Sequence, residues 1–215
     1  MPSIAVNAGS AGVQNFHTGT VTWSSTTSAT GASDGSYATG GSFGSGTVGD
    51  SLDFWNFNVS IPAGQTVNGL QLDIVARKTQ ISARAVSFTS CNCKINGILG
   101  TPTVNVNGTA LTTSAATYTY GGPTDLWGLS GGTLSQSNIN SNTENTGPTF
   151  GVWFTGGAGA SAATPDVDAV TLTVYYSPAS TSGPPNPINL YGGKVGGSEM
   201  LYTGPTKTIT AYGFR

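Results

Sequence analysis

The chain has 215 residues, of which 37% are hydrophobic and only 7% are charged, and its formal net charge is −2. Intrinsic disorder normally combines low hydrophobicity with high net charge, so this composition argues for a folded protein. The 7 Lys and Arg residues are too few to neutralise a row of phosphates, which excludes a nucleic-acid interface. Because a nearly uncharged surface repels other copies only weakly, the composition fits either a self-assembling protein or a neutral extracellular-type β domain.

Residues 1–49 are predicted to form an extended N-terminal segment and a long loop rich in Ser, Thr and Gly. The first residues lack the basic start and the uninterrupted apolar stretch of a signal peptide. No run in the chain approaches the roughly 20 apolar residues of a membrane span. We therefore expect folding in the cytoplasm without membrane insertion.

Residues 50–176 alternate apolar and polar side chains, which is typical of strands with one buried face. In one of these runs Trp55 shares a predicted buried face with Phe57. Asn96–Gly97 is a typical two-residue hairpin turn, because both residues tolerate positive φ. Only residues 134–140 could form a helical turn. Many short strands between Gly- and Pro-rich turns predict an all-β fold, an antiparallel β-sandwich of jelly-roll type.

The C-terminal part of the chain differs from the rest. Residues 177–187 form a Pro-rich linker, which favours extended backbone and prevents strand pairing. Residues 188–215 are predicted to form an arm with short apolar runs, and its side chains expected to take part in assembly are Tyr191, Tyr202 and Tyr212. So short a segment cannot bury a core of its own. We expect it to pack on the main domain or, as the favoured alternative, on another subunit.

No catalytic, metal or cofactor site is predicted. The G-x-G-x-x-G match at 44–49 lacks the preceding strand and following helix that a dinucleotide site requires. His17 is the single histidine, and no nucleophile elbow accompanies it. Cys91 and Cys93 are read as two reduced thiols packed as small apolar groups, because two ligands are too few for a zinc site. Arg84, beside a turn, is expected to be solvated.

Asp166 and Asp168 are the closest acidic pair. In a regular strand they would share a face about 7 Å apart, where they could bind a cation or flank a glycosidic bond. Acidic residues at a strand end more often cap a turn or protect an edge, and we favour that interpretation. Trp153, Phe54 and Tyr175, like Trp127, are candidates for exposed aromatic side chains that could stack on a sugar ring. Trp153 and Phe54 could instead cover a second face or an interface.

The loop sequence YGGPTDLWGLS (120–130) places a Trp between two Leu residues in a chain that is otherwise polar in its loops. Leu126 and Trp127 could form a ligand platform or could close the open end of the core. Burying a Trp removes 150–250 Å² from water, which is worth about 4–6 kcal/mol at most. We therefore favour a structural plug.

Four segments occur in a characteristic order: VSIPAGQTVNGLQLDIVARK (59–78), YGGPTDLWGLS (120–130), FGVWF (150–154) and VDAVTLTVYY (167–176). Together they resemble a domain found widely in structural proteins of tailed bacteriophages and in prophage regions. The resemblance covers residues 50–176 and implies a jelly-roll-like β-sandwich in a virion component, without catalysis. It carries over no active-site residue. The segment before FGVWF is longer and more polar than in the family, and the tail after residue 177 has no counterpart there.

These observations predict a non-enzymatic structural protein of a phage-like virion, assembled in the host cytoplasm. It would act as a capsid decoration protein or as a tail or fibre component. Its expected partners are further copies of itself and other virion proteins. The alternative is a carbohydrate-binding adhesin or receptor-recognition module that binds a host-surface glycan.

Overall fold

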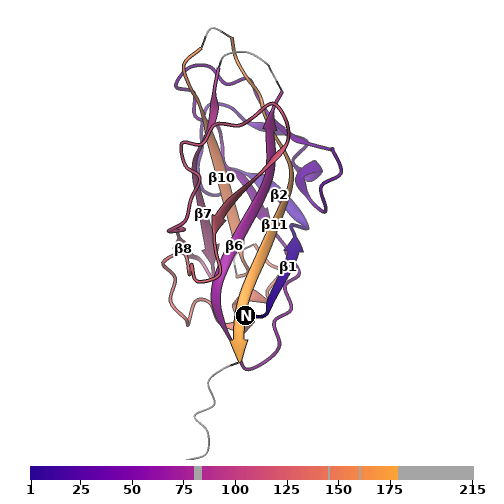
Figure 1. Cartoon of the computed structure of the whole chain (residues 1–215), viewed down its shortest axis with the longest axis vertical. Helices are drawn as coiled ribbons and strands as arrows, with labels where there is room; N and C mark the ends of the chain where they lie inside the picture. Colours follow the sequence, from indigo (N-terminus) through magenta and orange to yellow (C-terminus); the bar gives the residue numbers. More distant parts are fainter. Residues whose placement is uncertain (80–83, 145, 160, 179–215) are drawn as a thin grey trace, which may run out of the picture. The chain divides into compact units, whose positions relative to one another are not determined.

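Two antiparallel sheets pack face to face to form a β-sandwich (Figure 1). The computed structural model describes residues 1–79, 84–144, 146–159 and 161–178, all of which fall in one compact unit. The all-β sandwich expected from the sequence is therefore confirmed. Most of the predicted linker and the predicted arm, with Tyr191, Tyr202 and Tyr212, lie outside the described residues.

The larger sheet has six strands in the order β3-β4-β11-β6-β9, with β1 also pairing with β11. Its strands are β1 (Ser3–Asn7), β3 (Trp23–Ser24), β4 (Ala38–Gly40), β6 (Gln65–Lys78), β9 (Ala116–Gly121) and β11 (Pro165–Pro178). The two longest strands, β6 and β11, pair along their whole length and lie at the centre of this sheet.

The second sheet has five strands in the order β2-β5-β10-β7-β8. Its strands are β2 (Ser10–Val13), β5 (Leu52–Trp55), β7 (Val86–Ile95), β8 (Ile98–Gly100) and β10 (Thr149–Gly156). From β5 to β7, successive strands alternate between the two sheets, and so do β9, β10 and β11. The described helices are short: the 3-10 turn η1 (Thr26–Ala29) and α1 (Gln136–Ile139), which lies within the predicted helical turn.

Local sequence explains several of these elements. The period-two pattern of β6 buries Leu70, Leu72 and Ile74 completely, because alternate side chains of a strand point to one face. The β7–β8 hairpin turns at Asn96 and Gly97, whose φ values are 51° and 74°. Both values lie in the left-handed region that a two-residue hairpin turn requires. The hairpin expected at this dipeptide is therefore confirmed.

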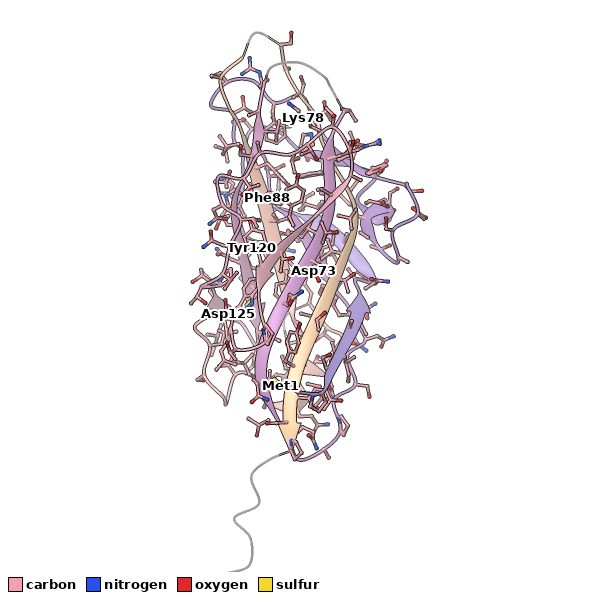
Figure 2. All side chains as sticks on the ribbon, in the orientation of Figure 1. Met1, Asp73, Lys78, Phe88, Tyr120 and Asp125 are labelled. Atoms are coloured by element: carbon pink, nitrogen blue, oxygen red, sulfur yellow. The ribbon has the colours of Figure 1, made fainter. Side chains whose placement is uncertain are left out.

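The core between the sheets is aromatic at its centre. The Phe88 ring lies 4.7 Å from Phe154, 4.8 Å from Tyr118 and 5.9 Å from Tyr120, measured between ring centroids. These separations are within the range of favourable aromatic pairs. Figure 2 shows Phe88 and Tyr120 in the middle of the sandwich. Cys91 and Cys93 are buried free thiols, as expected, and burial raises the pKa of both.

Residues 1–49 differ from the expected extended segment and loop, since they supply four strands. Three of them, β1, β3 and β4, belong to the six-stranded sheet, and β2 is an edge of the five-stranded sheet. Trp23, Ala29, Ala38 and Phe43 are buried in the core. These strands have two to five residues, so their sequence shows too few periods to be recognised. Their apolar side chains are stabilised only by contact with strands far away in the chain, which local reasoning does not detect.

The prediction that Trp55 lies on the buried face of β5 was wrong. The strand ends there, and the next residue, Asn56, has φ 60°, which interrupts the alternation. Phe54 therefore faces the core with no exposure, and so it is not the exposed aromatic that the sequence suggested. Trp55 is half-buried on the outer face, where Gly12 leaves room for its indole: a Cβ on Gly12 would lie 2.9 Å from the Trp55 ring. Phe57 returns to the core after the irregular backbone.

Candidate functional site

The Trp127 loop lies beside the middle part of β6 and the end of β8, and it is anchored in the core. The Leu70 N–H donates to the Asp125 carbonyl and the Thr101 N–H donates to the Trp127 carbonyl, both at 2.9 Å. The Trp127 side chain has no exposed surface, and its ring packs edge-on against Phe150 with centroids 5.0 Å apart. Its indole Nε1 donates a hydrogen bond of 2.9 Å to the backbone oxygen of Leu70 in β6. Leu126 packs half-buried against the same core, and Leu129 is buried. A ring with no exposed surface cannot serve as a ligand platform, so this geometry is that of a plug.

Asp125 holds the plug in place (Figure 2). One carboxylate oxygen accepts hydrogen bonds from the Thr103 backbone and hydroxyl, both 2.8 Å, and from the Val104 backbone at 3.0 Å. The other accepts one from the Trp127 backbone at 2.8 Å. Burial alone would raise the pKa of Asp125, but these four hydrogen bonds outweigh it, so the pKa is lowered. Trp127 itself has φ 55°, a conformation that this turn stabilises.

A second loop, residues 14–19, lies across the outer face of the five-stranded sheet. The backbone N–H of Asn15 donates to Asp53 at 2.7 Å, and that of Gly19 donates to Asp50 at 2.7 Å. The Phe16 ring lies over Gly151, where a Cβ would be 2.2 Å from a ring atom. Glycine is therefore required at position 151 for the loop to approach the sheet.

Asp53, like Asp166, keeps one buried carboxylate oxygen without a hydrogen-bond partner, and unlike Asp166 it is in no ion pair among the described residues. It has no exposed surface, and its Oδ1 has no hydrogen-bond partner. Burial raises the pKa of Asp53 to about 6, although the hydrogen bond from Asn15 opposes the shift. Sequence reasoning missed this residue. The available signal was an acid between Leu52 and Phe54, because a charged side chain inside an apolar strand needs a partner on the outer face.

Asp166 and Asp168 do not form one site. A register irregularity between Val167 and Ala169 shifts Asp168 out of the regular alternation. Asp166 is paired with Arg77, with Nε and Oδ2 3.2 Å apart, and the Arg77 guanidinium lies 3.8 Å from the centroid of the Tyr37 ring. The two carboxylates therefore face different neighbours.

Asp168 caps the loop at residues 33–35. Its carboxylate accepts hydrogen bonds from the Ser33 hydroxyl at 2.6 Å and from the backbone N–H groups of Asp34 and Gly35. Both acids of the pair are buried. The capping role that the sequence analysis favoured accounts for the contacts of Asp168, whereas Asp166 lies between β4 and β6 and is held by its ion pair with Arg77.

Arg84 is buried, contrary to its expected solvation. Its guanidinium donates to the carbonyl oxygens of Gly157 and Ser161, at 2.7 and 2.6 Å, and to that of Gly159. It therefore ties a loop between β10 and β11 to the sheet. Each of the three guanidinium nitrogens of Arg84 donates to one backbone carbonyl, and these bonds offset the cost of burying the charge.

Trp153 lies on the outer face of the five-stranded sheet and is half-buried. His17 stacks on it with ring centroids 5.3 Å apart and planes 16° apart. The backbone of His17 is tied to Ser51, whose hydroxyl accepts from the His17 N–H at 3.2 Å. Trp153 is thus a partly covered aromatic surface. Within the described residues no group of three or more His, Cys, Asp or Glu side chains could hold a metal ion.

Comparisons with known proteins leave the family open. No protein-family model matches the sequence, and no curated protein is significantly similar to it. Among the helices of the described residues, none has the length and apolar character needed to cross a membrane.

Proposed function

We propose that this chain is a non-enzymatic structural protein of a bacteriophage-like virion that assembles with copies of itself and attaches to the particle. The observation that carries the proposal is the surface of the sandwich. Among the charged residues that the structure describes, only Asp34 is exposed, and five others are half-buried. Six are buried: Asp50, Asp53, Arg84, Asp125, Asp166 and Asp168.

This distribution favours association because the faces of the sandwich present hydroxyl, amide and apolar groups. Such faces can meet a partner without removing water from ions, which is the costly step in burying a charge. They also lack the charge repulsion that keeps soluble monomers apart. The buried charges instead hold loops onto the sheets, as Asp125 and Arg84 do.

The strand pairing supports the jelly-roll type that the resemblance implies. If β1 and β5 to β11 are counted as eight strands, the first pairs with the last, and the second pairs with the seventh. The third pairs with the sixth, and the fourth pairs with the fifth. A long antiparallel ribbon rolled into two sheets would produce this nested order, and jelly rolls have eight strands in two such sheets.

The four segments that resemble the phage domain meet around Trp127. This residue bonds to Leu70 of β6 and packs on Phe150 of β10, and Leu70 is paired with Val174 of β11. The resembling residues therefore form one packed unit around the buried Trp127 ring. Such a unit supports a role in stability, because its Trp faces the core and has no exposed surface.

Particle location and association state test this proposal. Antibody labelling of particles from an infected or induced culture should place the protein on the virion, and light scattering of the purified full chain should give a multimer. A chain that stays monomeric at high concentration and is missing from purified particles would refute the structural role.

The alternative, recognition of a host-surface glycan, is favoured by one specific observation. On the outer face of the six-stranded sheet the Tyr175 hydroxyl donates to Gln71 at 2.9 Å, and the Gln71 amide donates to Asp73 at 2.9 Å. Thr119 also donates to Asp73, at 2.6 Å. An aromatic ring beside an ordered amide and carboxylate is chemistry that suits a neutral sugar. Binding on a glycan array that Tyr175→Ala abolishes, with folding unchanged, would favour this alternative.

A further inference from the structure

β1 is an open edge of the six-stranded sheet (Figure 1). One side of β1 pairs with β11, from Ser3 opposite Tyr175 to Asn7 opposite Thr171. No strand or loop of the described residues pairs with its other side. The side chains of Ser3, Ala5 and Asn7 are exposed, whereas Ile4 and Val6 are half-buried against the core.

The hydrogen-bond pattern between β1 and β11 shows which N–H and C=O groups of β1 point away from the sheet. Two bonds fix the alternation: Tyr176 N–H donates to Pro2 at 3.1 Å, and Ala8 N–H donates to Val170 at 2.9 Å. In an antiparallel pair, hydrogen-bonded and non-bonded residues alternate along the strand. The even-numbered residues of β1 therefore bond to β11. The N–H and C=O groups of Ser3, Ala5 and Asn7 point away from the sheet.

Proteins usually protect such an edge with a charge, a proline, a bulge or a covering segment. β1 has no charged residue, no proline and no register irregularity between Ser3 and Asn7. The other outer strands are better protected or shorter. The Gly121 N–H at the end of β9 donates to Val104, the Thr26 hydroxyl reaches the Ala11 carbonyl of β2, and β8 has three residues.

We propose that β1 pairs antiparallel with β1 of a second copy of this chain, about a two-fold axis at Ala5. In this register Ala5 lies opposite Ala5 of the second copy, and Ser3 lies opposite its Asn7. The outward groups of each strand meet those of the other, so the edge is complementary to itself, as a two-fold interface requires. The inference rests on the proposed self-assembly and names the surface that performs it.

The second copy is the occupant that fits best because the edge offers nothing to select another chain. Ser3–Asn7 carries no charged side chain that could attract a partner of opposite charge. Its outward side chains are small, so two copies can approach to the normal strand separation of about 4.8 Å. The result joins two six-stranded sheets into one continuous sheet.

Ala5 allows a charge-swap test in the full-length protein. Ala5→Lys puts two ammonium groups opposite each other at the axis, and Ala5→Glu puts two carboxylates there. Each variant alone should bind itself at least about fivefold more weakly than the original chain, because like charges directly opposite on paired strands are destabilising. An equimolar mixture of the two should recover association. Sedimentation velocity measures all three cases.

Thr117→Lys is the matched control, since it adds the same charge at an exposed position of β9, at the opposite edge of the same sheet. It should leave association unchanged. If Ala5→Lys associates as tightly as the original multimer, the β1 interface is wrong while self-assembly stands. If the original chain is itself monomeric, the proposed self-assembly fails as well.

Ala5→Pro separates edge pairing from folding. It removes an outward N–H and leaves the β1–β11 hydrogen bonds of Ile4 and Val6 in place, a substitution that edge strands tolerate. We expect loss of association with an unchanged circular dichroism spectrum. In the original protein, amide exchange at Ser3, Ala5 and Asn7 should slow as concentration rises. Slow exchange at these amides in a dilute monomer would mean that another part of the same chain covers the edge, and would overturn the proposal.

Discussion

Two loops of this protein are each held by a buried aspartate, and the two aspartates behave in opposite ways. Asp125 in the Trp127 loop accepts four hydrogen bonds, whereas Asp53 beneath the loop at 14–19 leaves its Oδ1 without a partner. The pKa of Asp125 is lowered, and the pKa of Asp53 is raised to about 6. Burial raises the pKa of both carboxyls; it dominates at the more deeply buried Asp53, whereas four hydrogen bonds outweigh it at Asp125.

The difference between the two aspartates indicates which of the two loops contributes more to the stability of the fold. The Trp127 loop inserts a large apolar ring into the core and satisfies its anchor completely. The loop at 14–19 covers an outer face and retains a partly unsatisfied carboxylate. We therefore expect substitutions in the first loop to cost more stability than those in the second, and the pH dependence of the two anchors to run in opposite directions.

Trp127→Ala should have the largest effect. Removing a fully buried Trp costs about 4 kcal/mol, which would lower the melting temperature of a domain of this size by about 10 °C. Trp127→Phe should cost less because it keeps a ring against Phe150 and loses only the bond to Leu70. Thermal denaturation followed by circular dichroism measures both. Unchanged stability of the Ala variant together with loss of glycan or receptor binding would show that Trp127 is not a plug.

Asp125→Ala should be the next most damaging change. It leaves the buried N–H of Trp127 and the partly exposed N–H groups of Thr103 and Val104 without their acceptor, and we expect a loss of about 2 kcal/mol at pH 7. Because the pKa of Asp125 is lowered on folding, its stabilisation is present above the unfolded value of 3.8 and is lost as the pH falls below it. The stability difference between variant and original, measured by urea denaturation, should therefore shrink in acid. A difference that stayed constant down to pH 3 would contradict this assignment.

Asp53→Asn should stabilise the protein at neutral pH, by about 1–2 kcal/mol. Keeping Asp53 ionised in the folded state at pH 7 costs at most about 3 kcal/mol, given a pKa raised from 3.8 to about 6. Since the raised pKa favours the protonated folded state, the stability contributed by Asp53 is present below about pH 4 and is lost as the pH rises to about 6. The Asn variant should lose that slope in urea denaturation between pH 4 and 7.

Asp50→Asn is the matched control for Asp53→Asn. Both Asp50 oxygens already have donors, from Gln14 at 2.9 Å and from Gly19 at 2.7 Å. The same substitution should therefore be neutral or destabilising there. Stabilisation by both substitutions would mean that general charge removal, and not the unsatisfied oxygen of Asp53, explains the result.

Trp153→Ala should have the smallest effect, about 1 kcal/mol. Its ring is half-buried and contributes mainly its stacking with His17, and such aromatic pairs are worth about 0.5–1.5 kcal/mol. Thermal denaturation should show a shift of a few degrees at most. A loss as large as that of Trp127→Ala would remove the contrast between a core plug and a surface aromatic.

The sequence alone determined the elements whose evidence is local. The alternation in β6 and β11 identified strands with one buried face, and the Asn96–Gly97 dipeptide identified a hairpin. It also singled out Trp127 as an apolar side chain in a polar loop. These results need only neighbouring residues, because side-chain direction in a strand and positive φ in a turn are set within a few positions.

Tertiary structure alone decided the rest. The short strands before residue 50 exist because distant strands pair with them, and the face of Trp55 changed because Asn56 has positive φ. The roles of Asp53 and Asp125 depend on donors from segments about 20 to 40 residues away. β1 likewise has an open edge because, within the described residues, no other strand pairs with its outer side. Such features depend on which distant segments contact each other in the fold. Hydrophobic periodicity and amino-acid composition do not determine those contacts.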